Sequence, residues 1–177
     1  MLSLLLRPLR NAALVLLAND SSRQIAAGVA IGMVLGLVPK GNLIAVALGV
    51  ALFGLKVNRS AGLLSAAAFS WMGAATDGFT HNLGAKALAV DGMQSTYAWL
   101  YELPLGPWIG FNNTVVLGSL LLGLYASYPC YLAAKLLLDR FQTPIAAWLK
   151  RRRVTRWLLG ADLTTRFGTP LGIGVGS

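Results

Sequence analysis

Charged residues are scarce in this sequence. Only 12% of its 177 residues are charged, about half the share of roughly 25% that is usual in a soluble domain. The apolar residues are gathered into long blocks rather than scattered through the chain. We therefore expect lipid to be the solvent of these blocks and the chain to be an all-α integral membrane protein.

Cysteine and histidine are almost missing, since Cys130 and His81 are the only two. A lone cysteine excludes an intrachain disulfide, and the pair excludes a metal site built from several such ligands. The 6 acidic residues are scattered, without the spacing of paired catalytic carboxylates. Neither a catalytic triad nor a phosphate-binding G-x-x-x-x-G-K-[ST] loop can be found. The sequence therefore predicts no cofactor and no enzyme.

Basic residues outnumber acidic ones and give a formal net charge of +9. In a soluble protein this excess would indicate nucleic acid binding. Here the basic residues flank apolar stretches, which favours contact with anionic lipid headgroups instead. The last apolar stretch is followed by four arginines that we interpret as a membrane-surface anchor: Arg151, Arg152, Arg153 and Arg156.

The lengths of the apolar blocks indicate which of them can cross a membrane. Residues 25–38 and 43–55 would each extend about 21 Å or less as helices, short of the roughly 30 Å hydrocarbon core. They predict a hairpin of two half-helices, turning at Pro39, that is re-entrant unless it crosses a thinned bilayer. Residues 61–80 and 114–134 are long enough to form two full transmembrane helices.

The two ends of the chain have a different character. Residues 1–18 combine leucines with two arginines and predict an amphipathic helix lying on the membrane. They lack the order of a signal peptide, so we expect them to be retained. Residues 135–159 predict a basic amphipathic helix, and the Gly- and Thr-rich residues 160–177 a flexible tail. The expected organisation is thus one helical membrane domain, residues 1–159, followed by that tail.

The distribution of basic residues predicts the orientation. No lysine or arginine occurs between Lys86 and Lys135, so this interval should face away from the cytoplasm. Both termini would then be cytoplasmic, in a bacterial inner membrane. The aromatic residues of the interval should lie at the headgroup level. They are Tyr97, Trp99, Tyr101 and Trp108.

Three glycines with four-residue spacing form the most specific pattern. Gly28, Gly32 and Gly36 fall on one helix face that ends at Pro39, and Gly49 lies on a similar small-residue face of the second half-helix. Missing side chains let helices approach closely in lipid. The face could pack internally, between the arms of the hairpin, or it could receive the transmembrane helix of a partner or of a second copy.

Polar residues at the ends of apolar runs are the candidates for a lipid or polar site. They are Lys40, Asn42, Asn58, Asp77, His81, Asn112 and Asn113. The asparagines fit helix N-caps, or else a polar rim around a lipid or ion path. Asp77 and His81 share a helix face and could be a structural hydrogen-bonded pair, a proton relay or a headgroup site. Lys40 would be costly at depth unless it reaches the surface or meets lipid phosphate.

The segment from Ala27 to Pro39, with Asn58 after a short second helix, resembles a bacterial membrane-domain family of unknown function. The stretches Thr76–Gly84 and Phe111–Gly118 resemble one small stand-alone subgroup of it, although Gly78 stands where that subgroup has proline. The resemblance covers about residues 1–150. It implies a gene neighbour of the AsmA-like kind, a long envelope protein thought to carry phospholipid toward the outer membrane.

Three classes of function follow from these observations. The leading one is a non-enzymatic inner-membrane subunit that anchors or feeds a phospholipid transport or assembly complex, with the bilayer and an AsmA-like protein as partners. The second is a small channel or transporter, which would have to oligomerise to enclose a path. The third is a membrane enzyme for lipid or polyprenyl substrates that would depend on Lys40, Asp77 and His81.

Overall fold

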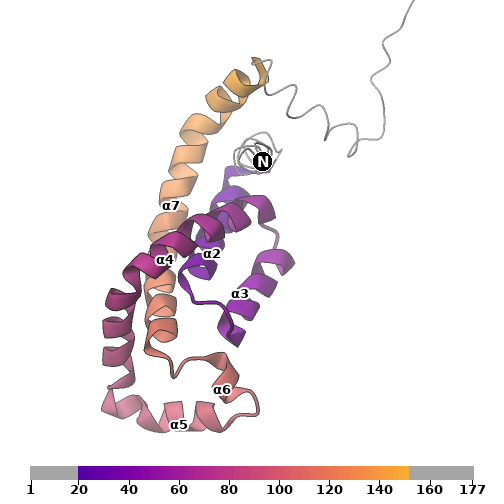
Figure 1. Ribbon diagram of the computed structural model, residues 1–177. Coiled ribbons are helices and arrows are strands. Elements are labelled where there is room, and N and C mark those ends of the chain that lie inside the picture. The colour runs from indigo at the N-terminus through magenta and orange to yellow at the C-terminus, as the bar shows by residue number, and fades with distance from the viewer. Residues whose placement is uncertain (1–19, 152–177) are drawn as a thin grey trace, which may run out of the picture.

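The computed structural model describes residues 20–151, the side chains of residues 143 and 145–151 excepted. Within this range every regular element is helical, which confirms the all-α prediction (Figure 1). The helices are α2 (Ser22–Leu37), α3 (Leu43–Gly54), α4 (Arg59–Leu88), α5 (Gln94–Glu102), α6 (Gly106–Ile109) and α7 (Thr114–Arg151), with a 3-10 turn, η1, at Asp91–Met93. The predicted N-terminal helix, the tail from Gly160, and Arg152, Arg153 and Arg156 lie outside the described residues.

Helix α2 begins and ends for reasons that are visible in its sequence. Its first turn is closed by a capping box, in which the backbone amide of Gln24 donates to Ser21 Oγ at 3.4 Å and the amide of Ser21 donates to Gln24 Oε1 at 3.2 Å. It ends at Leu37, because Pro39 has no amide hydrogen with which to continue the helix. The 16-residue helix is therefore a half-span, as predicted.

Helices α4 and α7 are both longer than the spans predicted within them. Helix α4 has 30 residues and runs through Asp77–Gly78 without a break. Helix α7 has 38 residues and contains Pro129 and Pro144 in its interior. The predicted basic amphipathic segment from residue 135 is, as far as Arg151, the continuation of α7.

One helix of the described part of the chain is long and apolar enough to cross a membrane, namely α7 over Thr114–Gln142. Helices α2 and α3 are apolar but shorter than a span. Helix α4 has the length, but its glycine, serine and threonine residues make it less apolar than the Thr114–Gln142 segment of α7. The second full transmembrane helix that the sequence predicts is therefore not established by length and composition.

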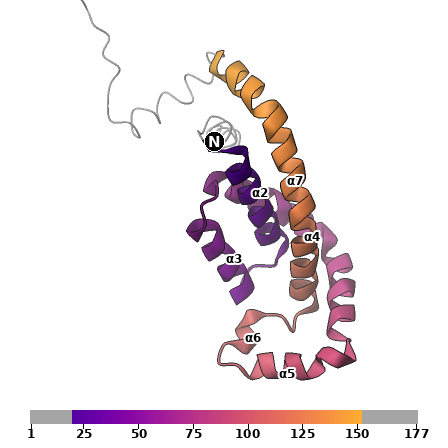
Figure 2. The ribbon, with the colours of Figure 1, turned by 180° about the vertical axis from the view of Figure 1, so that it is seen from behind.

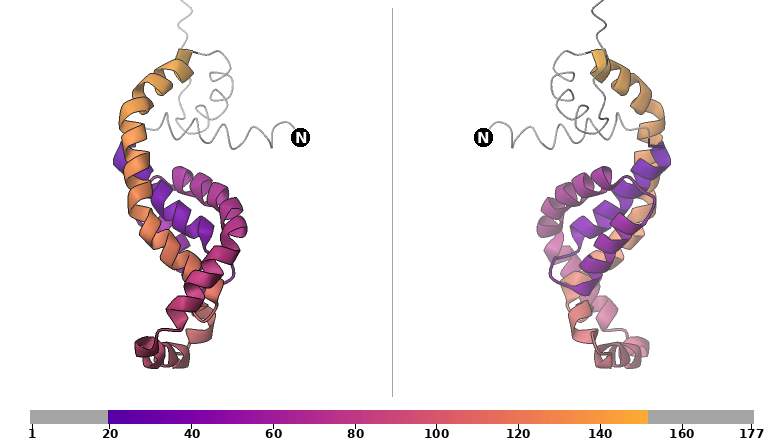
Figure 3. Two further views of the ribbon diagram at one scale, coloured as in Figure 1. Left: turned by 90° about the vertical axis from the view of Figure 1, so that its left-hand side faces the viewer. Right: turned by 90° about the vertical axis from the view of Figure 1, so that its right-hand side faces the viewer.

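Three helices form the body of the fold. Helix α2 lies between α7 and the first part of α4 (Figure 3, where α2 is indigo, α7 orange and α4 magenta). Helix α4 curves away from α2 and its second part runs beside the start of α7 (Figures 1 and 2). Helix α3 stands to the side of this bundle. Helices α5 and α6 lie across its lower end in Figure 1.

The core of the bundle is built mainly from small and medium-sized residues. Its larger cluster of buried residues comprises Met33, Val34, Leu37, Val38, Ala45 and Val116, and a smaller cluster contains Ile25 and Ala61. The large apolar side chains lie mostly outside. Trp71 is 85% exposed, Tyr125 is 86% exposed, and further exposed leucines, valines and phenylalanines are spread over α3, α4 and α7. This distribution is the reverse of that in a soluble protein.

Candidate functional site

The glycine stripe (Gly28, Gly32 and Gly36) packs against α4 over its whole length. A Cβ on Gly28 would overlap the carbonyl oxygen of Asn58, and one on Gly32 would overlap that of Gly62. A Cβ on Gly36 would lie 2.7 Å from the carbonyl oxygen of Ala66. The internal partner of the stripe is therefore α4, and the expectation that it packs on the second arm of the hairpin is wrong. A partner helix could dock there only by displacing α4.

A second close crossing, between α4 and α7, was missed by the sequence analysis. A Cβ on Gly84 would overlap the carbonyl oxygen of Thr114, and a Cβ on Gly118 would overlap that of Thr80. The sequence contains a pattern that could have predicted this crossing, because α4 and α7 each carry a threonine and a glycine four residues apart. The same spacing relates Asn58, Gly62 and Ala66, which receive the glycine stripe. Gly62 and Ala66 are small residues like those of the stripe, but no glycine repeat marks this face of α4.

Asn58 connects the start of α4 to the start of α2. Its side-chain oxygen accepts a hydrogen bond from the amide of Ala61 at 2.7 Å and its side-chain nitrogen donates to Asp20 at 2.6 Å. Its own amide donates to the carbonyl of Gln24 at 3.0 Å. Because Asn58 is only 7% exposed and these groups are all paired, its role is structural. It caps α4, as predicted.

The same end of the bundle has a second polar link. Ser22 Oγ, at the start of α2, donates to the carboxylate of Asp139 on α7. Lys135 forms an ion pair with the same carboxylate at 3.0 Å. The starts of α2 and α4 therefore lie at the level of residues 135–139 of α7, and the turn between α2 and α3 lies toward the other end.

Lys40 has a local role in that turn. Its ammonium group donates to the carbonyl oxygens of Leu35 at 2.6 Å, Gly36 at 3.1 Å and Val38 at 2.7 Å. These carbonyls lie at or just beyond the C-terminal end of α2, where a positive charge is favourable. The three donors of the ammonium are thus occupied, and Lys40 acts as a C-terminal cap of α2.

Asn42 and Asn113 cap the two helices that begin beside this turn. Asn42 Oδ1 accepts from the amide of Ala45 at 2.9 Å, while Asn42 Nδ2 donates to the carbonyl of Pro39 at 2.7 Å. Asn113 Oδ1 accepts from the amide of Val115 at 2.9 Å. Capping is confirmed for both residues. Asn112, by contrast, is exposed and makes no hydrogen bond to another described residue.

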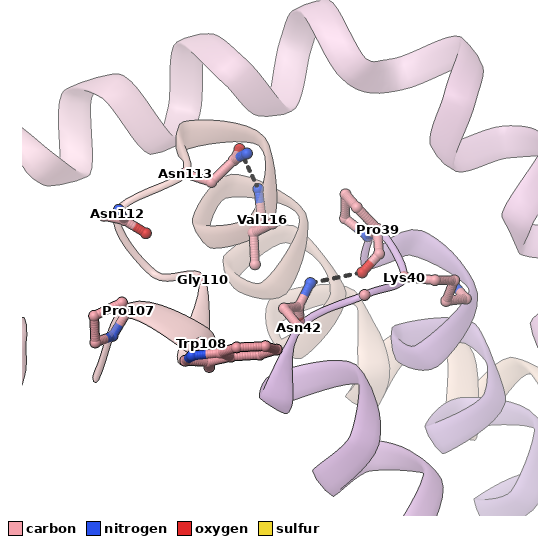
Figure 4. Close-up of a pocket in the computed structure, with 10 residues that line it drawn as sticks. Pro39, Lys40, Asn42, Pro107, Trp108, Gly110, Asn112, Asn113 and Val116 are labelled. Carbon is pink, nitrogen blue, oxygen red and sulfur yellow. Dashed lines mark hydrogen bonds between the residues drawn. The ribbon is translucent and has the colours of Figure 1, made fainter. Parts of the chain in front are cut away.

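A pocket of about 710 Å³ lies between the α2–α3 turn and the segment that precedes α7 (Figure 4). It is lined by Pro39, Lys40, Gly41, Asn42, Pro107, Trp108, Gly110, Asn112, Asn113 and Val116. Four of the predicted polar candidates, Lys40, Asn42, Asn112 and Asn113, thus meet at one place although they come from parts of the chain some seventy residues apart. In Figure 4 the Lys40 side chain turns toward α2, away from the asparagines. We call this cavity the tip pocket.

Asp77 and His81 lie outside the tip pocket and are not bonded to each other. His81 Nδ1 is 2.6 Å from Thr114 Oγ1, and this hydrogen bond links α4 to the first residue of α7. Both Asp77 and His81 are exposed. The expected hydrogen-bonded pair is therefore wrong, and the histidine reinforces the crossing of α4 and α7. Over the described residues no group of three acidic, histidine or cysteine side chains could hold a metal ion.

The predicted aromatic residues gather on α5 and α6, which we call the aromatic platform. Tyr97 stacks on Phe111 with ring centroids 6.1 Å apart and donates from its hydroxyl to the carbonyl of Ala87 at 3.1 Å. Trp99 and Trp108 are mostly exposed. The platform thus packs on the rest of the fold through the Tyr97–Phe111 pair. The indoles of Trp99 and Trp108 are exposed to the solvent that surrounds the protein.

Gly49 of α3, the glycine predicted on the small-residue face of the second half-helix, lies beside open space. A Cβ added to Gly49 would meet no atom within 4 Å. Only Ala45 and Leu52 of α3 are buried, whereas Val46, Val50 and Phe53 are exposed. The outward face of α3 (Val46, Val50 and Phe53) is therefore apolar and largely uncovered, apart from the guanidinium of Arg59, which lies over the Phe53 ring with its Cζ 6.0 Å from the ring centroid.

Comparison with known proteins gives a relative but no function. An uncharacterized protein of Treponema pallidum (strain Nichols) is 29% identical to this chain over 126 residues, which cover 71% of this chain and 78% of the relative. No protein-family model matches the sequence. No solved structure matches it either. The relative shows that the chain has a counterpart of similar extent in a spirochaete.

Proposed function

We propose that the chain is an integral protein of a bacterial inner membrane. The observation that carries the proposal is the inverted distribution of side chains, with glycine, alanine and serine at the helix contacts and large apolar residues outside. In water the exposed tryptophans and leucines would favour aggregation, whereas acyl chains solvate them. In lipid, close contacts between small residues hold helices together. A span of 29 residues in α7 agrees with this placement.

In the proposed topology α4 provides the second full transmembrane helix, besides α7. Between Ser60 and Thr76 it carries no charge, and this stretch of α4 includes the exposed residues Leu63, Trp71 and Met72. Small residues are needed where α2 and α7 approach α4. As a consequence, the mean hydropathy of α4 is lower. A helix selected for close packing can thus be a membrane span that composition alone does not mark.

We infer that the hairpin formed by α2 and α3, although each arm is shorter than a full span, crosses a thinned bilayer to the membrane surface at which α7 starts. The tip pocket supports this placement, because in it Asn42 of the turn lies against Gly110 and near Val116. The start of α2, bonded to Asp139, lies at the opposite surface. Lys40 then lies at the headgroup level rather than in the hydrocarbon core, and its depth is no longer an energetic problem. By the positive-inside rule the tip faces away from the cytoplasm.

Within that membrane we propose a non-enzymatic subunit that anchors or feeds a phospholipid transport or assembly complex. The resemblance of the sequence to a small membrane-domain subgroup implies an AsmA-like envelope protein as the partner. The outward face of α3, with Gly49 open beside it, is the surface that we assign to the partner's transmembrane helix, because the glycine stripe is occupied by α4. The arrangement disfavours the membrane enzyme, since Lys40 and His81 are bonded within the fold.

Co-purification tests this function. The full chain, tagged and extracted from native membranes in a mild detergent, should bring down a large envelope protein that has a transmembrane helix. Replacing Val50 with arginine on the outward face of α3 should abolish the capture, while the same change at exposed Tyr125 on α7 should not. Recovery of a monomer alone would contradict the proposal. Recovery of a homo-oligomer that passes ions in liposomes would favour the channel instead.

A further inference from the structure

The tip pocket contains hydrogen-bond donors that the fold does not use. Of its asparagines, Asn42 is fully engaged, since its side-chain oxygen and nitrogen both have backbone partners. The side-chain nitrogens of Asn112 and Asn113 donate to no other residue of the described chain, and Asn113 uses only its oxygen for capping. In Figure 4 both side chains lie on the wall of the pocket opposite Lys40. The cavity thus has a wall of free amide groups.

The electrostatic character of the pocket suits a negatively charged group. None of the described residues that line it is acidic. In addition, α3 begins at Leu43 and α7 at Thr114, so that the N-terminal ends of two helices meet at the same cavity and add partial positive charge. The ammonium of Lys40 belongs to the same turn. An anion that accepts hydrogen bonds would therefore be favoured over a cation.

The surroundings of the pocket suit a molecule that is partly apolar. Trp108 forms one wall and is 70% exposed. Leu105, close before it in the sequence, is also exposed. Val116 of the α7 span also lines the pocket, and the apolar helix α3 begins directly after Asn42. In the topology proposed above, the pocket lies at the depth of lipid headgroups, where an indole is favourable.

We propose that the tip pocket binds the phosphate-bearing headgroup of a phospholipid whose acyl chains stay in the bilayer. The amides of Asn112 and Asn113 donate to the phosphate oxygens, and the indole of Trp108 packs against the glycerol and the first acyl carbons. The inference rests on the membrane placement in the proposed function and adds to it a ligand class and a site. It assigns the recognition of lipid to neutral amides rather than to Lys40.

Retention of radiolabelled dihexanoyl phosphatidylglycerol by the purified full chain in detergent tests the site. Asn112→Asp places a carboxylate beside the phosphate, and Trp108→Ala removes the wall. Each should weaken retention by about tenfold, which for Asn112→Asp corresponds to the loss of a hydrogen bond to a charged group and for Trp108→Ala to the loss of buried apolar contact. The controls are Asn82→Asp, which adds the same charge at an exposed position of α4, and Trp99→Ala, which removes the other indole of the platform. Both controls should bind as the wild type does.

Two further probes identify the source of the phosphate. Glycerol 3-phosphate carries the phosphate without acyl chains, and dihexanoyl glycerol carries the chains without phosphate. The proposal predicts that neither competes at concentrations at which the phospholipid saturates. Competition by dihexanoyl glycerol, or equal retention by the Asn112→Asp and Asn82→Asp variants, would overturn it.

The outcome can be separated from that of the proposed function. Asn112 and Trp108 are not part of the outward face of α3, so the variants should still capture the envelope partner. Loss of lipid retention with capture intact supports the tip pocket as the lipid site. If no pocket variant changes lipid retention while all of them still capture the envelope partner, the lipid site is refuted and the proposed function is not.

Discussion

Gly32 of α2 lies against Gly62 of α4 so closely that a Cβ on Gly32 would overlap the carbonyl oxygen of Gly62. Leu52 of α3 approaches Gly62 from another direction and is fully buried. Three helices therefore meet at one glycine. Because the obstacle to a side chain here is backbone, the helices would have to move apart to accept one.

Gly32→Val should destabilise the fold by about 1–3 kcal/mol, the usual cost of overpacking a tight contact. Denaturant titration in detergent micelles, followed by circular dichroism, measures the loss as a lower midpoint. Gly49→Val is the matched control, because a Cβ at Gly49 meets open space. It should change the stability by less than about 0.5 kcal/mol. Equal effects of the two substitutions would contradict the packing described.

Asn58→Ala should lower the stability by about 1–2 kcal/mol, because it removes the cap of α4 and the bond to Asp20. Asn112→Ala removes the same side chain at a position that makes no hydrogen bond in the described structure, and it should have almost no effect. Denaturant titration followed by circular dichroism compares the stabilities of the two variants. If Asn112→Ala proved the more damaging, the roles of the two asparagines would be reversed.

Lys40→Met should weaken the C-terminal end of α2 by about 1 kcal/mol, since a cation at a helix C-terminus is favourable. Hydrogen exchange of the amides of residues 33–38 should accelerate locally. Lys56→Met, in the turn after α3, removes an exposed lysine that forms no hydrogen bond to the described residues, and it should leave these amides unchanged. If Lys40 instead served phosphate binding, the Lys40→Met variant would lose lipid retention, and the hydrogen exchange of residues 33–38 would not change.

The sequence predicted the features of this fold that depend on near neighbours. The caps formed by Asn42, Asn58 and Asn113 act within three residues of themselves. Such signals are complete in a short window. The half-span lengths of the hairpin arms follow from residue counts in the same way.

The partners of distant residues could not be read from the sequence. Four-residue spacing shows that Gly28, Gly32 and Gly36 share a face, but it does not show which helix covers that face. His81 bonds to Thr114, 33 residues away, rather than to Asp77 on its own helix. The tip pocket was hidden for the same reason, because Asn42 and Asn112 become neighbours only through the packing of α2, α4 and α7.

Labelling of single cysteines in intact cells tests the proposed membrane placement most directly. In a Cys130→Ser background, Gly41→Cys and Asn112→Cys should react with a membrane-impermeant maleimide from the outside, while Ser60→Cys reacts only after the membrane is opened. Val50→Cys, exposed on α3 but shielded from water by lipid or by the partner's helix in this account, should stay unlabelled in both conditions. Labelling of Gly41→Cys and Ser60→Cys from the same side, or rapid labelling of Val50→Cys, would contradict the account.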